Sequence, residues 1–425
     1  MAESKWTQAK DRNSLIEPLI KMLHDHSKLD EKGEFVGFDF NKIDSREVID
    51  NLSALVDYSE DLPHIKGEEF LRSAVHNAAR NNRLSSGAII QEVRNAESNY
   101  LSKPLQSQYL LTSMSIKYFD DLKKIIFEDT SIRFFRTLPK GFSQDHFGAE
   151  DILYPIKAPE YYTWVKVHVK TRCEHSAFVK ALDTLDLLRG IWNLSLDRRR
   201  RIMFLGVRPQ PANSIVLGPI HTLHDRHGSP ITHVYQWEPN YVQPQRLQEL
   251  VKDYSNLRYW ELKRRRCFQR SPYANYIRNT IIQYARALDE ANSQTALMKL
   301  WSVLERATLT RSHEGNDVTV RRASFFFDNK RYHTATLQRL RLNRNQFVHE
   351  GIEILDSQDS LYKLRKYVIY CIDFLIQLST KFEGLDEYRG FLDLPNDSSK
   401  IRNLEKRLKK EDRWVRLYKA LKNEV

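Results

Sequence analysis

The sequence has few cysteines and no long apolar run, and both absences exclude classes of protein. Its three cysteines, Cys173, Cys267 and Cys371, lie far apart, which argues against a disulfide framework and fits a reducing cytoplasm. The longest apolar stretch, residues 367–378, is interrupted by Asp373 and is too short to span a bilayer. No apolar segment follows the first five residues, as a secretory signal would require. We therefore expect a cytoplasmic protein with no membrane partner.

Common nucleotide-binding and hydrolase signatures are absent as well. The chain has no Walker phosphate loop, no dinucleotide glycine fingerprint and no Gly-x-Ser-x-Gly elbow. It has no internal repeat and no low-complexity tract. We expect no cofactor.

The length, composition and charge of the chain indicate how many domains it has and what kind of partner it binds. A chain of 425 residues is long enough for two or three domains, and 41% hydrophobic residues permit a sizeable core. The net charge of +12 and the pI near 9.3 favour an acidic partner, with nucleic acid as the first candidate.

Two basic runs concentrate this charge, at residues 198–201 and 263–266. The second run follows the aromatic pair Tyr259 and Trp260 and consists of Lys263, Arg264, Arg265 and Arg266. Cations beside aromatic rings suit phosphate contact and base stacking on unpaired RNA, so this run is a candidate RNA-binding element. A solvated loop or interdomain ion pairing is an equally good explanation of each run.

The first 265 residues mix two periodicities. Helical patterns cover residues 67–81 and 174–192, and the β-like stretches are residues 109–116, 163–169, 202–207, 214–217 and 231–237. Strands followed by long helices predict an α+β domain of unknown type over residues 1–265. A sensor or substrate-recognition role for it is a hypothesis.

Residues 266–425 have helical patterns throughout. In order, the expected elements are helical residues 273–309 with an internal Glu305, a polar loop at 311–317, a short helix at 318–327, a helix at 334–349, an apolar helix at 361–378 and a packed, basic amphipathic tail at 399–421. Gly351 is expected to stop the fourth of these.

One hexapeptide in the helix expected at 334–349 combines a permanent cation with a titratable imidazole. Arg344 and His349 are five residues apart, Asn345 follows the arginine, and Glu350-Gly351 follow the histidine. Arginine can neutralise a phosphate with a fixed fork of donors, and histidine moves protons near neutral pH. In an α-helix five residues apart means about 140° of rotation, so only the long arginine side chain could close the gap.

Arg344 is not the only arginine of this segment. Arg339 and Arg341 form a basic ladder with it, and both are candidate RNA-binding residues. We assign the catalytic position to Arg344 because it alone combines the spacing to His349 with a polar residue directly after it.

Taken together, these motifs resemble the HEPN superfamily, and within it the Apea-like HEPN group. The matching segments are Leu300-Trp301-Ser302-Val303-Leu304-Glu305, Leu340 through the Arg344-Asn345 pair, and Phe347-Val348-His349-Glu350-Gly351. The likeness covers about residues 270 to 380. It implies an all-α HEPN-like bundle over residues 266–425 and a homodimeric, metal-independent endoribonuclease with a role in microbial antiviral defence or as a toxin. RNA and a second copy of the chain are the expected partners, with a regulatory or trigger protein as a further candidate.

The resemblance also suggests roles for four residues. His349 would act as general base on the ribose 2′-hydroxyl or as general acid to the leaving 5′-oxygen. Arg344 would stabilise the charge on the phosphorane, and Asn345 would orient His349 or the phosphate. Glu305 would hold Arg344 or His349 in place. Attack by the 2′-oxygen predicts products with a 2′,3′-cyclic phosphate and a 5′-hydroxyl.

Two alternatives remain open at this stage. A HEPN module that has lost catalysis could serve only for dimerisation or RNA binding. A metal-dependent nuclease could instead use His221, His224 and His227, which are spaced by three in a segment expected to be a loop.

Overall fold

The computed structural model describes most of the chain. The described residues are 3–7, 12–39, 44–59, 62–143, 159–198, 210–238, 241–244, 246–354, 356–395 and 398–422. Contacts divide them into two compact units. One unit comprises residues 1–108 with 170–177, and the other comprises residues 109–169 with 178–425.

The first unit is built mainly from helices. Its elements are β1 (Lys5–Trp6), α1 (Arg12–Asp25), β2 (Ser27–Leu29), β3 (Phe35–Phe38), α2 (Ser45–Ser53), β4 (Val56–Asp57), α3 (His64–Arg80) and α4 (Ser86–Ser102). Asp44 and Ser85 cap α2 and α4 by accepting backbone N–H bonds, as short polar side chains do at helix starts. Leu23, Leu52, Leu71 and Val75 are fully buried in its core.

The second unit contains a six-stranded sheet in the order β10-β9-β5-β8-β7-β6. The strands are β5 (Gln106–Met114), β6 (Lys124–Phe127), β7 (Thr130–Phe135), β8 (Thr163–Thr171), β9 (Ile220–His224) and β10 (Pro230–Trp237). The pairs β10–β9, β9–β5, β8–β7 and β7–β6 are antiparallel. Burial alternates along β8, as expected for a sheet with one face on the core.

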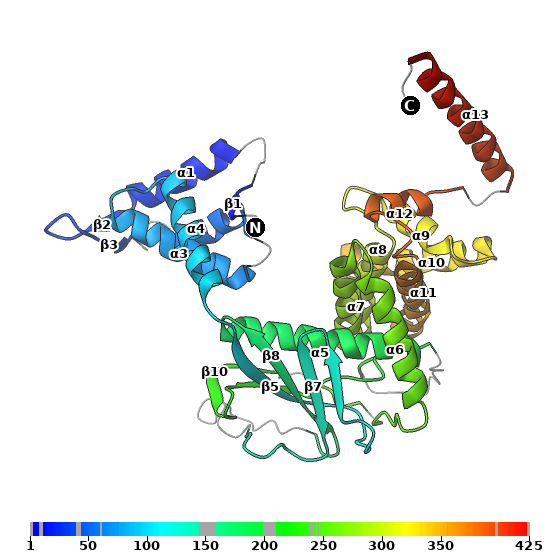
Figure 1. Ribbon diagram of the computed structural model, residues 1–425, viewed down its shortest axis with the longest axis horizontal. Helices are drawn as coiled ribbons and strands as arrows, with labels where there is room; N and C mark the ends of the chain where they lie inside the picture. Colours follow the sequence, from blue (N-terminus) through cyan, green and yellow to red (C-terminus); the bar gives the residue numbers. More distant parts are fainter. Residues whose placement is uncertain are drawn as a thin grey trace. The chain divides into compact units, whose positions relative to one another are not determined.

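The helix α5 (Glu174–Leu196) covers that buried face, and Trp192 stacks on Phe134 of β7 (Figure 1). The helical part of the unit is anchored to α5 by buried arginines. Arg189 donates to Asp289 at 2.6 and 2.5 Å, and Arg264 donates to Ser195 at 2.6 Å and Asp373 at 3.0 Å.

The C-terminal helices follow in chain order. They are α6 (Tyr254–Gln269), α7 (Ala274–Asp289), α8 (Ser293–Ala307), α9 (Asn316–Ser324), α10 (Lys330–Asn345), the π-helical turn η1 (Gln346–Glu350), α11 (Ser357–Gln377), α12 (Leu385–Leu392) and α13 (Ser398–Lys422). The helix α8 has a buried apolar side, since Ala296, Leu300 and Leu304 have no exposed surface.

The structure therefore has both helices and a mostly antiparallel sheet, followed by a helical region, as the two periodicities predicted. The β-like stretches at 109–116, 163–169 and 231–237 correspond to β5, β8 and β10. The stretch at 202–207 lies outside the described residues. The expected domain boundary after residue 265 falls inside α6 and stays a prediction.

The strand expected at 214–217 was wrong. Asn213 and Ile215 face helices instead of a neighbouring strand: the Asn213 N–H donates to the Leu288 carbonyl, and the Ile215 N–H to Asn193. The Val216 carbonyl accepts from the Ser115 N–H, and the Gly218 N–H donates to the Ser113 carbonyl, but these contacts form an isolated bridge between Leu217 and Met114 and no strand. The segment is apolar because it is buried against α5 and α7.

Two further expectations concern the longest helices. Within the described residues, none is long and apolar enough to cross a membrane. The C-terminal tail is helical as predicted, but it is not packed, because Trp414 and Val415 of α13 are more than half exposed.

Candidate functional site

The hexapeptide lies where α10 changes its winding. Asn329 caps the start of α10, and the helix buries Leu337 and Leu340. Phe347 in the following turn is only half-buried. Gly351 ends the segment with φ of +66°, a left-handed conformation that suits glycine, so the predicted stop is confirmed.

The π-helical turn changes the geometry between the two motif residues. After Asn345 the backbone bonds over five residues, and the Gly351 N–H reaches the Gln346 carbonyl. Residues five apart come closer to one face in such a turn than the 140° of a regular α-helix allows. The π-helical winding therefore reduces the angle around the helix axis that separates Arg344 from His349. His349 itself is exposed.

Arg344 is half-buried and lacks a carboxylate partner among the described residues. Its Nη1 donates to Asn345 Oδ1 at 3.1 Å, while its buried Nε has no hydrogen-bond partner. Asn345 Oδ1 also accepts a long bond of 3.4 Å from Asn316 Nδ2 at the start of α9. A buried guanidinium N–H without a partner is costly, and an anion would satisfy it.

The two neighbouring arginines differ from Arg344 in having carboxylates nearby, although the buried Nε of Arg341 also has no hydrogen-bond partner. Arg341 forms an ion pair with Asp317 of α9, and Arg339 lies 3.8 Å from Asp356. The Arg339 contact is long and exposed, so it contributes little. Of the three arginines in the ladder, Arg344 is the one without a carboxylate partner in the described structure.

Glu305 does not contact the hexapeptide. Its Oε1 accepts the Trp301 indole N–H at 2.8 Å, an i,i+4 bond on α8. The cationic partner expected for it is therefore replaced by an indole N–H. Among the described residues, it forms no ion pair with Arg344 or His349.

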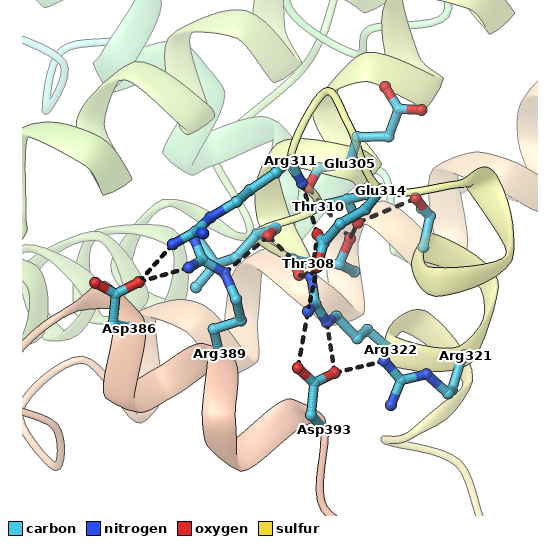
Figure 2. Close-up of polar contacts among 12 residues, drawn as sticks. Glu305, Thr308, Thr310, Arg311, Glu314, Arg321, Arg322, Asp386, Arg389 and Asp393 are labelled. Carbon is cyan, nitrogen blue, oxygen red and sulfur yellow. Dashed lines mark hydrogen bonds and ion pairs between the residues drawn. The ribbon is translucent and has the colours of Figure 1, made fainter.

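A buried arginine network fixes the loop that leads to Asn316 (Figure 2). Arg322 of α9 is 1% exposed and donates to Asp393 at 2.8 Å and to Glu314 at 3.0 Å. It also donates to the Leu309 carbonyl at 2.9 Å. In Figure 2 the Glu305 carboxylate points away from this network, and only its backbone carbonyl takes part, accepting from Thr310 N–H.

Arg322 thus ties the loop at residues 308–316 to the end of α12 and sets where α9 begins. Glu314 is held from a second side by the Arg311 N–H at 2.8 Å. Arg322 holds the pKa of Asp393 below its usual range, so the carboxylate stays charged. The position of Asn316, and through it the Asn345–Arg344 pair, depends on this network.

Three apolar residues within or next to the motif in the sequence are exposed. Leu342, Val348 and Ile352 are each between 41% and 54% exposed. They are candidates for contact with a partner.

The basic run on α6 divides into surface and interior residues. Lys263 and Arg266 are exposed, and Lys263 lies over the Trp260 ring at 4.7 Å. Arg264 is buried in its ion pair with Asp373, which argues against direct RNA contact. Arg265 is half-buried, pairs with Glu261 at 3.0 Å and lies over Phe127. Internal ion pairing, the alternative to RNA binding, therefore accounts for Arg264.

That run borders a cavity of about 920 Å³ between α5, α6 and α11. Trp260, Lys263 and Arg264 contribute to its wall together with Asp373 and Tyr362.

The three histidines proposed as a metal site do not form one. His221 and His224 lie in β9 instead of a loop, and side chains three apart in a strand point to opposite faces. His221 bonds to Thr112 Oγ1 at 2.8 Å, and His224 Nδ1 lies 3.1 Å from the Gly228 carbonyl. Burial lowers the pKa of His221 to about 4 and lowers that of His224 as well. No group of three metal-ligating side chains occurs in the described structure.

Asn316 is the residue that sequence reasoning missed. It lies 29 residues before its partner Asn345, and no local pattern links the two. A lone asparagine at a helix start looks like an ordinary capping residue.

The comparisons with known proteins give no relative: no family model, no curated protein and no solved structure matches this chain.

Proposed function

We propose that the chain is a metal-independent endoribonuclease of the HEPN type, with its site at Arg344 and His349. One observation carries the proposal. Arg339 and Arg341 each lie within ion-pair distance of a carboxylate, whereas Arg344 has no carboxylate partner in the described structure. The buried Nε of Arg344, like that of Arg341, has no hydrogen-bond partner. An arginine held in this way is suited to receive a phosphate.

The chemistry follows from the two side chains. His349 is exposed in the π-helical turn that begins two residues after Arg344, and this rare winding is frequent at functional sites. As general base it removes the 2′-hydroxyl proton, or as general acid it protonates the leaving 5′-oxygen, each worth about 10²–10⁴-fold in rate. Arg344 stabilises the growing charge on the phosphorane. The products carry a 2′,3′-cyclic phosphate and a 5′-hydroxyl.

Three neighbours act on these two residues. Asn345 accepts from Arg344 and fixes its side chain. Asn316 holds the Asn345 amide from the other side and so prevents it from turning away. Glu305 stabilises α8 through Trp301 and supports the site only at a distance.

A homodimer completes the site. One Arg344 and one His349 supply too few groups for a base, an acid and charge stabilisation together. The exposed apolar residues Leu342, Val348 and Ile352 border the motif, and a two-fold axis there would cover them and bring two motifs to one cleft. The defence or toxin role, and control by a trigger protein, extend this proposal.

The bond of Glu305 to Trp301 favours one alternative, a HEPN module without catalysis, because it leaves the motif without the expected acidic neighbour. Cleavage assays separate the two functions. Purified protein is incubated with total RNA, with and without a chelator, and the cleaved ends are analysed for cyclic phosphate and 5′-hydroxyl.

The matched control for His349→Ala is His227→Ala, since both histidines are exposed and His227 belongs to the rejected metal cluster. We expect chelator-resistant cleavage that disappears in His349→Ala, persists in His227→Ala and leaves the melting temperature within a few degrees. Cleavage that is lost on chelation, or that survives in His349→Ala, contradicts the proposal. Complete absence of cleavage by the wild-type protein favours the inactive module.

A further inference from the structure

Three cations lie in register across the outer strands of the sheet. Lys124 of β6 is paired with Arg133 of β7, which is paired with Lys166 of β8. Cross-strand partners share one face, and this face is opposite to the one that α5 covers, because Ile125, Ile132 and Val167 alternate with these cations and are buried. Lys124, Arg133 and Lys166 are called the cationic row below.

The cationic row has no internal compensation. Lys124 and Arg133 are exposed, and none of the three cations forms an ion pair with a carboxylate in the described structure. No Asp or Glu lies on this face of β6, β7 or β8. Like charges directly opposite one another destabilise a sheet. Burial and the neighbouring Arg133 both lower the pKa of Lys166, which reflects this repulsion.

Aromatic side chains border the row on both sides. Two residues away along the strands, Trp164 is paired with Phe135, and both are half-buried. On the other side, His168 stacks on Tyr109 at a ring distance of 4.9 Å. Two residues of a strand span about 7 Å, so each aromatic pair is within reach of a base whose phosphate contacts the row.

Lys166 is held in place by rings. Its Nζ lies 5.4 Å from the Tyr109 ring, 5.5 Å from Phe135 and 4.4 Å from Phe142. The ammonium is therefore fixed on the face without being neutralised, since an aromatic ring attracts a cation but carries no net charge.

We propose that this face of the sheet binds single-stranded RNA, with phosphates on the cationic row and bases stacked on the bordering aromatic rings. The positive charge without carboxylate partners selects a polyanion, and the half-buried rings of Trp164 and Phe135 beside it favour unpaired bases over a duplex or an acidic protein. The choice of RNA over single-stranded DNA rests on the proposed ribonuclease function. The sheet would then hold the RNA whose cleavage occurs at Arg344 and His349.

The test measures binding of a fluorescent single-stranded RNA to the full-length chain by anisotropy, in the His349→Ala background so that the RNA stays intact. The variant Lys124→Glu/Arg133→Glu changes the charge by four units. Its control is Lys21→Glu/Lys32→Glu, which changes the charge equally at two exposed lysines of the first unit.

We expect the row variant to raise Kd on the order of 10-fold at physiological salt, while the control raises it far less. The slope of log K against log salt should fall by about 1.4, because each single-strand phosphate contact contributes about 0.7. Trp164→Ala should weaken binding on the order of 10-fold, and Trp164→Phe should restore most of it, since a phenyl ring still stacks. Melting curves show whether each variant is folded, and only folded variants are compared.

Two results overturn the inference. Equal losses in the row variant and in its control would show that only total charge matters. Duplex RNA or heparin binding as tightly as the single strand, with no effect of Trp164→Ala, would show a general anion surface without base stacking.

The outcome is separable from the proposed function. Row-dependent binding by a wild-type protein that cleaves nothing rejects the ribonuclease and leaves the RNA-binding face standing. Cleavage by wild-type protein whose binding ignores the cationic row does the reverse.

Discussion

Replacing Arg322 by methionine is expected to release the loop at residues 308–316 and to reduce cleavage without touching the motif. Methionine keeps most of the volume of the side chain but removes its bonds to Asp393, Glu314 and the Leu309 carbonyl. Breaking a buried ion pair by removing one partner costs about 3–5 kcal/mol. Both carboxylates are partly open to water, at 34% exposure for Asp393 and 21% for Glu314, and can rehydrate. We therefore expect the local stability to fall by about 3 kcal/mol.

The matched control is Arg321→Met. Arg321 is adjacent in sequence and bonds to the same Asp393, but its side chain is 46% exposed. An exposed pair of this kind contributes at most about 1 kcal/mol. The difference between the two variants therefore measures burial of the pair instead of the count of charges.

Hydrogen exchange followed by mass spectrometry is the suitable assay, because a large chain with two units need not unfold in one step. A loss of about 3 kcal/mol corresponds to faster exchange by roughly 100-fold in peptides covering residues 308–324. In Arg321→Met the same peptides should change by less than about 10-fold. The reasoning is refuted if Arg322→Met exchanges like the wild type, or if both variants lose protection equally.

The remaining predictions concern the motif and one buried histidine. Arg344→Ala should reduce turnover by about 10²–10³-fold in single-turnover assays, far more than Arg339→Ala or Arg341→Ala. Arg344→Lys should also have low turnover. Equal mild losses at all three positions would make the ladder a binding surface only. Mixing inactive His349→Ala and Arg344→Ala subunits should recover partial cleavage if the site is shared, whereas a mixture that stays inactive, or a fully active monomer by light scattering, rejects the dimer. Burial lowers the pKa of His221 to about 4, so as pH falls this histidine takes up a proton in the unfolded chain before it does so in the folded chain. The free energy of unfolding of the wild type therefore falls by up to about 3 kcal/mol between pH 6.5 and pH 4. His221→Gln should lack this part of the pH dependence in urea titrations, and identical pH slopes would contradict it.

The helical course of the C-terminal part could be predicted from its period. Leu337 and Leu340 are buried, and Gly351 ends the segment with a positive φ, because both features follow from local spacing and backbone freedom. The π-helical turn could not be predicted, since the hexapeptide satisfies an α-helical period equally well.

The histidine cluster shows where prediction from local sequence fails. The spacing of His221 and His224 looked like a ligand set in a loop, yet pairing with β5 and β10 draws them into a strand. Strand geometry then sends the side chains to opposite faces, where each finds a separate hydrogen-bond partner.

The sequence alone determined the alternation of strands and helices, the excess of positive charge and the placement of Arg344 and His349 five residues apart in one helical segment. Only the tertiary structure decided which cations are neutralised: Arg264 meets Asp373 across 109 residues, Arg341 meets Asp317 across 24, and Arg344 meets no carboxylate in the described structure. The same holds for the cationic row, whose members come into register only when β6, β7 and β8 pair. The physical reason is that a charge is compensated by whatever lies within a few ångströms, and distance along the chain does not determine that neighbour.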